Sequence, residues 1–507
     1  MRRLFAAVVA LAMLAAGRPA CAAWHKAETD LFVVYGDVRE DTLRDYALKL
    51  SYFDRVLRMY APPPKDAPQL SKLDIYVLRD INDLRRILPH VSGYAGFYHA
   101  SPRAVFAALI PAPEGVTSKD EVLFHEYAHH YMLGNFPAAY PAWFVEGWAD
   151  FFATTKFTAT GYQIGAYDES RVAELFDDDW LPLPELLSKH PGETKNVAQF
   201  YSQAWLLTHY MYDDPQRAEQ FNRATKAIAA GADPVKAIEQ ASGLTTVQLT
   251  GRLHGYRQIH IASFAGRPPG PEPKVSMNEV PDSAGDFLLD RLRIGVADAK
   301  KPDAGYLREL RARAKKVPGS EFAQLTLASA EYLYGDPTAA DAIVRPYLAA
   351  RPDDRDALAT AGIGKTMAGE RFAERRAELF HEARPYLIGA YAADKDDYRV
   401  LFAYATSRAI EPDYPNDNDI KALLEARAIA PSVQEISLAA GAALMKRGQA
   451  DQAKPILAAV ANNPHANRLA RAAKAVMEGK TLDEALADKP KDAKAAAAGG
   501  APAKPGS

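Results

Sequence analysis

The chain has 507 residues, of which 48% are hydrophobic and 25% are charged, and its formal net charge is −3. This length favours more than one domain, and mild acidity without a long basic run argues against nucleic acid as a partner. The only cysteine is Cys21. Disulfide bonds are therefore excluded within the chain.

The segment 1–22 has the pattern of a cleavable signal peptide. Arg2 and Arg3 form its positive end, the segment 4–16 is apolar, and Ala20-Cys21-Ala22 is an A-x-A cleavage site. The apolar run is too short to span a bilayer. We expect cleavage after Ala22 and an exported protein, periplasmic or secreted, without a transmembrane segment. Removing the three arginines of the signal takes the net charge from −3 to −6. The alternative is a lipoprotein modified at Cys21.

Apolar runs and their boundaries predict the first elements of the mature chain. The expected elements are strands at 31–36, 73–78 and 105–110, and helices at about 40–60 and 80–88. Residues 118–121, Ser-Lys-Asp-Glu, form a capping box that predicts the start of another helix. Gly134-Asn135 predicts its end.

Residues 125–130 are His-Glu-Tyr-Ala-His-His and contain the pattern HExxH. On a helix, His125 and His129 lie about one turn apart on one face, a separation that suits two ligands of a tetrahedral metal ion. Glu126 then lies beside them, where its carboxylate can take a proton from metal-bound water. His130 is turned by ~100° from His129 around the helix. It is therefore interpreted as a packing or hydrogen-bonding histidine.

A second, largely buried helix is expected from Pro141, and it carries a third candidate ligand. Glu146 follows His129 at a spacing that is long enough for the first helix to end and the second to return. Asp150 lies one turn beyond Glu146 on the same face. It can accept the second N–H of a ligand histidine.

The rest of the chain predicts one more apolar helix at 200–210, on which His209 is interpreted as a core histidine, and then a change in composition. The segment 266–274 is rich in proline and predicts a linker that few contacts cross, so a chain ending near Pro268 is expected to fold alone. Residues 489–507 predict a disordered tail. Between them, residues 275–488 have a helical pattern.

Two intervals of this helical region have nearly equal lengths. One runs from Pro318 to Pro352 and the other from Pro431 to Pro464, and each holds two helical patterns. These intervals resemble tetratricopeptide repeats, whose concave surface holds a peptide or a partner protein. A purely architectural role is the alternative.

With HExxH at 125–129 and ExxxD at 146–150, residues 28–260 resemble the gluzincins, a clan of zinc metallopeptidases. Within that clan, the chain most resembles bacterial peptidase-MA-like proteins with an appended helical repeat domain. The resemblance implies an α+β zincin-like catalytic domain over residues 23–265, followed by an all-α, tetratricopeptide-like domain. It also implies one zinc ion per chain, bound by His125, His129 and Glu146.

Two further roles are implied by the same resemblance. Tyr201 matches a gluzincin tyrosine that leans toward the metal, where a phenol can hydrogen-bond an oxyanion; the alternative is a core aromatic. The strand at 105–110 would form the edge of the sheet above the metal and pair with a substrate backbone; the alternative is an ordinary sheet edge. The Gly-x-Met-Glu-Asn motif of gluzincin aminopeptidases is absent from the sequence, which puts exopeptidase action in doubt.

These features predict an exported zinc metallopeptidase that acts on a peptide or protein, with Glu126 as general base. Two alternatives stay open. The helical repeats could do the biological work beside an inactive peptidase domain, although Glu126 argues against this because a scaffold needs no general base. The other alternative is a zinc hydrolase that cleaves a non-peptide amide, for example in the cell wall.

Overall fold

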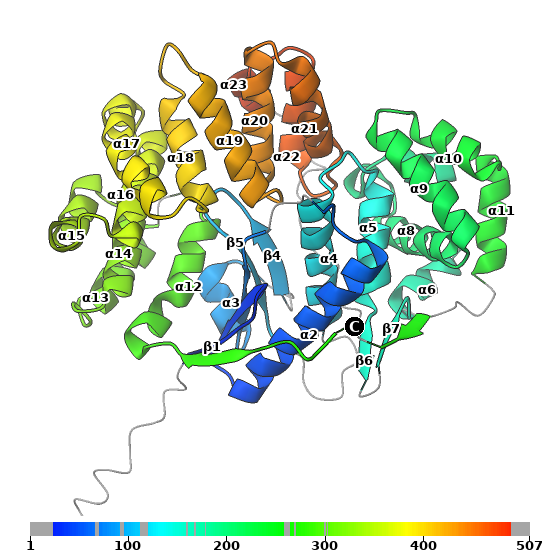
Figure 1. Cartoon of the computed structure of the whole chain (residues 1–507), viewed down its shortest axis with the longest axis horizontal. Helices are drawn as coiled ribbons and strands as arrows, with labels where there is room; N and C mark the ends of the chain where they lie inside the picture. The colour runs from blue at the N-terminus through cyan, green and yellow to red at the C-terminus, as the bar shows by residue number, and fades with distance from the viewer. Residues whose placement is uncertain are drawn as a thin grey trace, which may run out of the picture.

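The computed structural model describes residues 24–487 apart from short segments at 66–69, 92–95, 112–119, 159–160, 167–168, 178, 258–263, 268–269, 299–300 and 302. An N-terminal α/β region with a mixed sheet is followed by an all-helical C-terminal region (Figure 1). The predicted signal peptide, the predicted tail from 489, and Ser118 and Lys119 of the predicted capping box lie outside the described residues. Among the helices that are described, none has the length and apolar character needed to cross a membrane.

The N-terminal region is built on a six-stranded sheet. From edge to edge its strands are β4 Gly96–Ala100, β5 Val105–Leu109, β3 Leu73–Val77, β2 Phe32–Gly36, β1 His25–Glu28 and β9 Ser276–Glu279. The three central strands β5, β3 and β2 are parallel, and the others pair antiparallel with their neighbours. The three strands predicted from apolar runs are confirmed, with ends shifted by at most one residue.

Strand β5 is not an edge strand, so the expectation that residues 105–110 form the sheet edge is wrong. β4 pairs with it along its whole length, from Gly96 opposite Leu109 to Ala100 opposite Val105. The two strands form a hairpin whose turn is closed by the bond from the N–H of Ser101 to the carbonyl of Ala104, 2.9 Å. The outer edge on this side therefore belongs to β4.

Side chains alternate between the two faces along the central strands, so both faces of the sheet carry apolar side chains. Helices cover both faces and bury these side chains. On β3, Leu73, Ile75 and Val77 join the core beneath helix α2 (Glu40–Tyr60), whereas Tyr76 points to the opposite face. That face is covered by the helices α3 Ile81–Ile87 and α12 Asp282–Val296. Helices α2 and α3 confirm the two that the sequence predicts at 40–60 and 80–88.

Three helices beside the sheet carry the residues of interest: α4 Glu121–Asn135, α5 Ala142–Ala153 and α8 Val197–Tyr212. Every residue of α5 is buried. A Cβ atom on Gly147 of α5 would lie 2.3 Å from the carbonyl oxygen of Ala204 on α8, so glycine is what allows these helices to cross closely.

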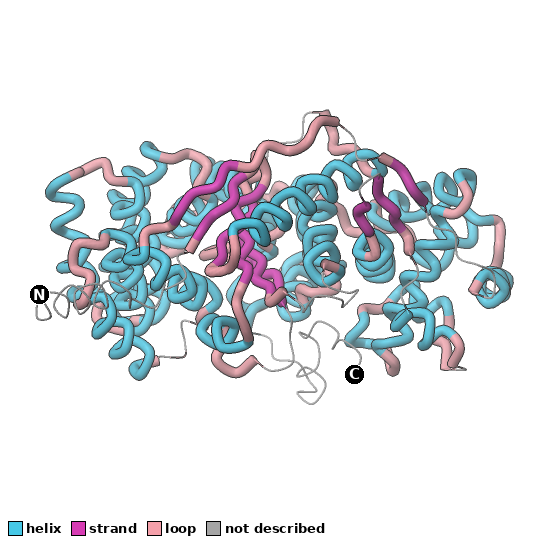
Figure 2. The backbone as a smooth tube through the Cα atoms, turned by 90° about the horizontal axis from the view of Figure 1, so that it is seen from below, coloured by secondary structure: helices cyan, strands magenta, loops and turns pink. Residues whose placement is uncertain are grey.

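Shorter elements complete the N-terminal region. They are the helices α6 Glu169–Leu175, α7 Leu183–Ser188, η1 Pro191–Glu193, α9 Pro215–Ala229, α10 Pro234–Ser242 and α11 Thr246–Tyr256, and the strands β6 Lys156–Thr158, β7 Gly161–Ile164 and β8 Phe264–Gly266. The three strands form a small antiparallel sheet. Figure 2 shows helices between this sheet and the six-stranded one.

The C-terminal region consists of consecutive helices that pack on one another. They are α13 Ala304–Ala314, α14 Glu321–Tyr334, α15 Pro337–Ala350, α16 Arg355–Arg371, η2 Ala373–Arg375, α17 Arg376–Ala393, α18 Tyr398–Arg408, α19 Asp417–Ile429, α20 Gln434–Lys446, α21 Ala450–Asn462, α22 Asn467–Met477 and α23 Leu482–Ala487. Each of the two intervals noted in the sequence holds two helices, α14 with α15 and α20 with α21. The series runs from beside α12 to above α4 (Figure 1).

The proline-rich segment does not separate two independent sets of contacts, and the expectation that few contacts would cross it is wrong. Strand β9, which follows the segment, pairs with β1 from Ser276 opposite Glu28 to Glu279 opposite His25. Helix α12 shares one hydrophobic core with α3 and with Trp24. The first elements after the predicted linker therefore complete the N-terminal fold.

Candidate metal centre

Helix α4 is fixed against α2, and this packing sets the direction of its histidines. The ring of Phe124 stacks on Phe53 with centroids 4.3 Å apart. The hydroxyl of Tyr127 donates a 2.7 Å hydrogen bond to Asp54, which is buried. These contacts hold one face of α4 on the core. The neighbouring face carries His125 and His129, whose Nε2 atoms lie 3.0 Å apart.

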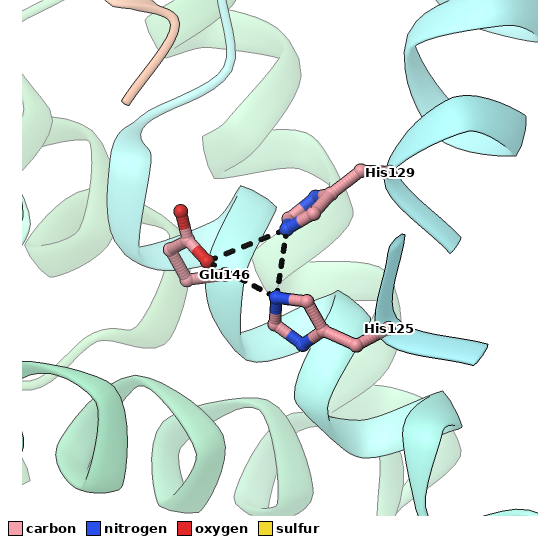
Figure 3. Close-up of side chains that lie close together, drawn as sticks. All are labelled: His125, His129 and Glu146. Atoms are coloured by element: carbon pink, nitrogen blue, oxygen red, sulfur yellow. Dashed lines mark hydrogen bonds and ion pairs between the residues drawn. The ribbon is translucent and has the colours of Figure 1, made fainter. Parts of the chain in front are cut away.

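The carboxylate of Glu146 reaches the same point from α5 (Figure 3). Its Oε2 atom lies 3.6 Å from Nε2 of His125 and 3.4 Å from Nε2 of His129. Zinc bonds of about 2.0–2.1 Å place two ligands of a tetrahedral ion roughly 3.3 Å apart. The three atoms are therefore spaced as ligands of one such ion would be.

The burial of Glu146 supports a bound cation. Its side chain is 0% exposed, and Oε2 accepts no hydrogen bond within the described part of the chain. A buried carboxylate oxygen that accepts no hydrogen bond is costly, and a metal ion is one way to offset that cost. Among the described residues, His125, His129 and Glu146 are the group of side chains whose ligand atoms are close enough to share an ion. The donor set of two imidazoles and one carboxylate fits zinc.

Asp150 contacts the far side of one of these histidines. Its Oδ1 lies 2.8 Å from Nδ1 of His125, and Arg171 of α6 forms an ion pair with its other oxygen at 3.0 Å. Burial raises the pKa of Asp150, but the charges of Arg171 and His125 lower it more. The carboxylate therefore stays ionised and can hold the proton of Nδ1, leaving Nε2 of His125 directed at the candidate metal position.

Glu126 lies on α4 beside the two histidines and is partly exposed. Its charge contributes to raising the pKa of His125, of Tyr98 on β4 and of Tyr201 on α8. The Glu126 carboxylate is therefore within electrostatic range of α4, β4 and α8. A general base would need this location beside the metal ligands, open to an incoming water molecule.

Tyr201 is half-buried on α8, with the guanidinium carbon of Arg171 5.1 Å from its ring centre. Burial raises its pKa, and the charges of Glu146 and Asp150 raise it further. The phenol therefore remains protonated at neutral pH and is able to donate a hydrogen bond. Arg171 also forms the ion pair with Asp150, so Tyr201 lies close to the residues that surround the candidate metal centre.

Two other histidines lie outside the group, as the sequence analysis expected. Nδ1 of His130 contacts the hydroxyl of Tyr98 at 2.9 Å, so this residue links α4 to β4. His209 is completely buried between Trp205 and Phe151, and burial lowers its pKa to about 3. Both interpretations, as a hydrogen-bonding and as a core histidine, are confirmed.

Sequence reasoning missed two residues of this site, Arg171 and His465. His465 lies between α21 and α22, far beyond Glu146 in the sequence, and its Nε2 is 3.0 Å from Oε1 of that glutamate. Neither residue belongs to a recognisable motif. The only related signal was Pro464, which ends one of the two repeat-like intervals.

Comparison of the chain with family models, curated proteins and solved structures found no match.

Proposed function

We propose that the protein is an exported zinc-dependent metallopeptidase, with one zinc ion held by His125, His129 and Glu146. The observation that carries this proposal is the convergence of two imidazole nitrogens and one buried carboxylate oxygen, 3.0 to 3.6 Å apart, beside a carboxylate that is partly exposed. A bound zinc ion would supply a Lewis acid and lower the pKa of its water to about 7.

The chain's own residues would divide the remaining work. Glu126 accepts a proton from the attacking water and delivers it to the nitrogen that leaves. Tyr201 donates its hydroxyl proton as a hydrogen bond to the oxygen that becomes negative. Asp150 holds His125 in one tautomer and orientation. Arg171 keeps Asp150 ionised, because its charge lowers the pKa of that carboxylate.

Metal content tests the centre directly. We expect about one zinc per wild-type chain, and a sharp loss of zinc in His129→Ala and Glu146→Ala because each removes a ligand. The measurement is elemental analysis of protein purified without chelators and dialysed against zinc. His130→Ala is the matched control, since His130 follows His129 but binds Tyr98 instead. Wild-type protein that takes up no stoichiometric metal would overturn the assignment.

Tyr201→Phe tests the oxyanion donor. We expect the zinc content to stay unchanged and kcat on a peptide substrate to fall by about 10²–10³, the usual cost of one lost oxyanion donor. The measurement is the steady-state rate on a fluorogenic peptide library. An unchanged kcat would leave Tyr201 with a packing role alone.

Cleavage of cell-wall amides in place of peptides would favour the non-peptide alternative.

A further inference from the structure

His465 contacts the candidate metal centre from the C-terminal helical region. Its Nε2 lies 3.0 Å from Oε1 of Glu146, and its ring centre lies 4.8 Å from that of His129. The side chain is 50% exposed, whereas Glu146 is completely buried. The imidazole therefore meets the metal centre on one side and solvent on the other.

The loop that carries His465 is well fixed. The side chain of Asn463 accepts a 2.9 Å hydrogen bond from the backbone N–H of His465, and Pro464 restricts the backbone between them. Asn462 donates a 3.1 Å hydrogen bond to the carbonyl oxygen of Ala139, just before α5 begins. The loop is thus attached to the segment that leads into the helix of Glu146.

The two oxygens of Glu146 have different surroundings. Oε2 faces Nε2 of both His125 and His129 (Figure 3), and Oε1 faces His465. A donor at Oε1 would hold the carboxylate in one rotamer and leave Oε2 as its single metal-binding atom.

We infer that His465 is a positioning residue of the zinc centre, supplied by the last helices of the chain, and that it orients the ligand Glu146 through Oε1. This inference rests on the proposed zinc site. It implies that the metal centre is composite: two ligands come from α4 and one from α5, and the group that orients the third comes from the loop between α21 and α22. The helical region then contributes to the active site as well as lying beside it.

Zinc affinity of the full chain tests this inference. We expect His465→Ala to bind zinc about 10–100-fold more weakly, the usual effect of removing a partner of a metal ligand. His465→Gln should stay close to wild type, because the glutamine Nε2 can reach the same place and donate a hydrogen bond. The dissociation constants are measured by competition with a chelator of known affinity. Far-UV circular dichroism verifies that each variant is folded.

Two further variants make the comparison decisive. His381→Ala removes an exposed histidine of the same helical region that pairs with Glu411, so its zinc affinity should equal that of wild type. Asn462→Ala loosens the loop without touching the imidazole and should weaken zinc binding in the same direction as His465→Ala. The inference is overturned by a His465→Ala variant that binds zinc as tightly as wild type, or by a glutamine variant as weak as the alanine one.

The proposed function is tested separately within the same series. If His129→Ala also keeps its zinc, the metal centre itself is misassigned. If zinc binding follows the expected order but wild-type protein cleaves no peptide, the role of His465 stands and the peptidase proposal falls.

Discussion

Glu126→Gln is expected to keep its zinc and to lose peptide hydrolysis by about 10²–10⁴-fold, the usual contribution of a general base. Glutamine has nearly the same shape as glutamate, and Glu126 is not one of the three converging ligands, so metal binding should be unchanged. The amide cannot accept a proton from water at neutral pH. Loss of rate without loss of metal is therefore the signature of this role.

The measurement pairs kcat on a fluorogenic peptide with elemental analysis of the same preparation. Glu219→Gln serves as the control, because Glu219 lies on the surface of α9 in an exposed ion pair with Arg223. Its turnover should match wild type. Turnover of Glu126→Gln close to wild type would show that another group takes the proton, whereas a fall in zinc content would assign Glu126 to metal binding.

The local part of the site could be predicted from the sequence because helical periodicity alone determines it. Residues four apart on one helix share a face, which accounts for His125 with His129 and for Glu146 with Asp150. The packing of α5 beside α4 could also be predicted, because the segment that connects the two helices is short. The core strands were also predictable, because β2, β3 and β5 are mostly buried on both faces and are therefore rich in apolar residues.

What the sequence did not reveal depends on long-range packing. The position of β5 inside the sheet follows from its pairing with β4, a choice that apolar patterning does not encode. Arg171 and His465 reach the site from α6 and from the loop before α22, and no local spacing relates them to the metal ligands. The proline-rich composition at 266–274 indicated a break, yet the next strand, β9, pairs with β1.

This pairing changes the expected result of truncation. From the sequence alone, a chain ending at residue 268 should fold and bind zinc without the rest. The structure leads us to expect the opposite, because such a chain lacks β9 and α12. The truncation removes four buried side chains from the core shared with α3, namely Val280, Leu288, Leu289 and Leu292. At about 1.5–3 kcal/mol each, their loss approaches the whole stability of a typical domain, about 5–15 kcal/mol.

The test compares three chains that all begin at Trp24 and end at residue 268, residue 297 or the natural C-terminus. The chain ending at 268 is expected to be insoluble or to lack a cooperative thermal transition. The chain ending at 297 regains β9 and α12 and should be more stable, as measured by its soluble yield and its melting temperature. Because it still lacks His465, its zinc affinity should fall as it does in His465→Ala. Equal melting curves for the two shortened chains would show that β9 and α12 are dispensable. A chain ending at 297 that binds zinc as tightly as the full chain would show that the helical region adds nothing to the metal centre.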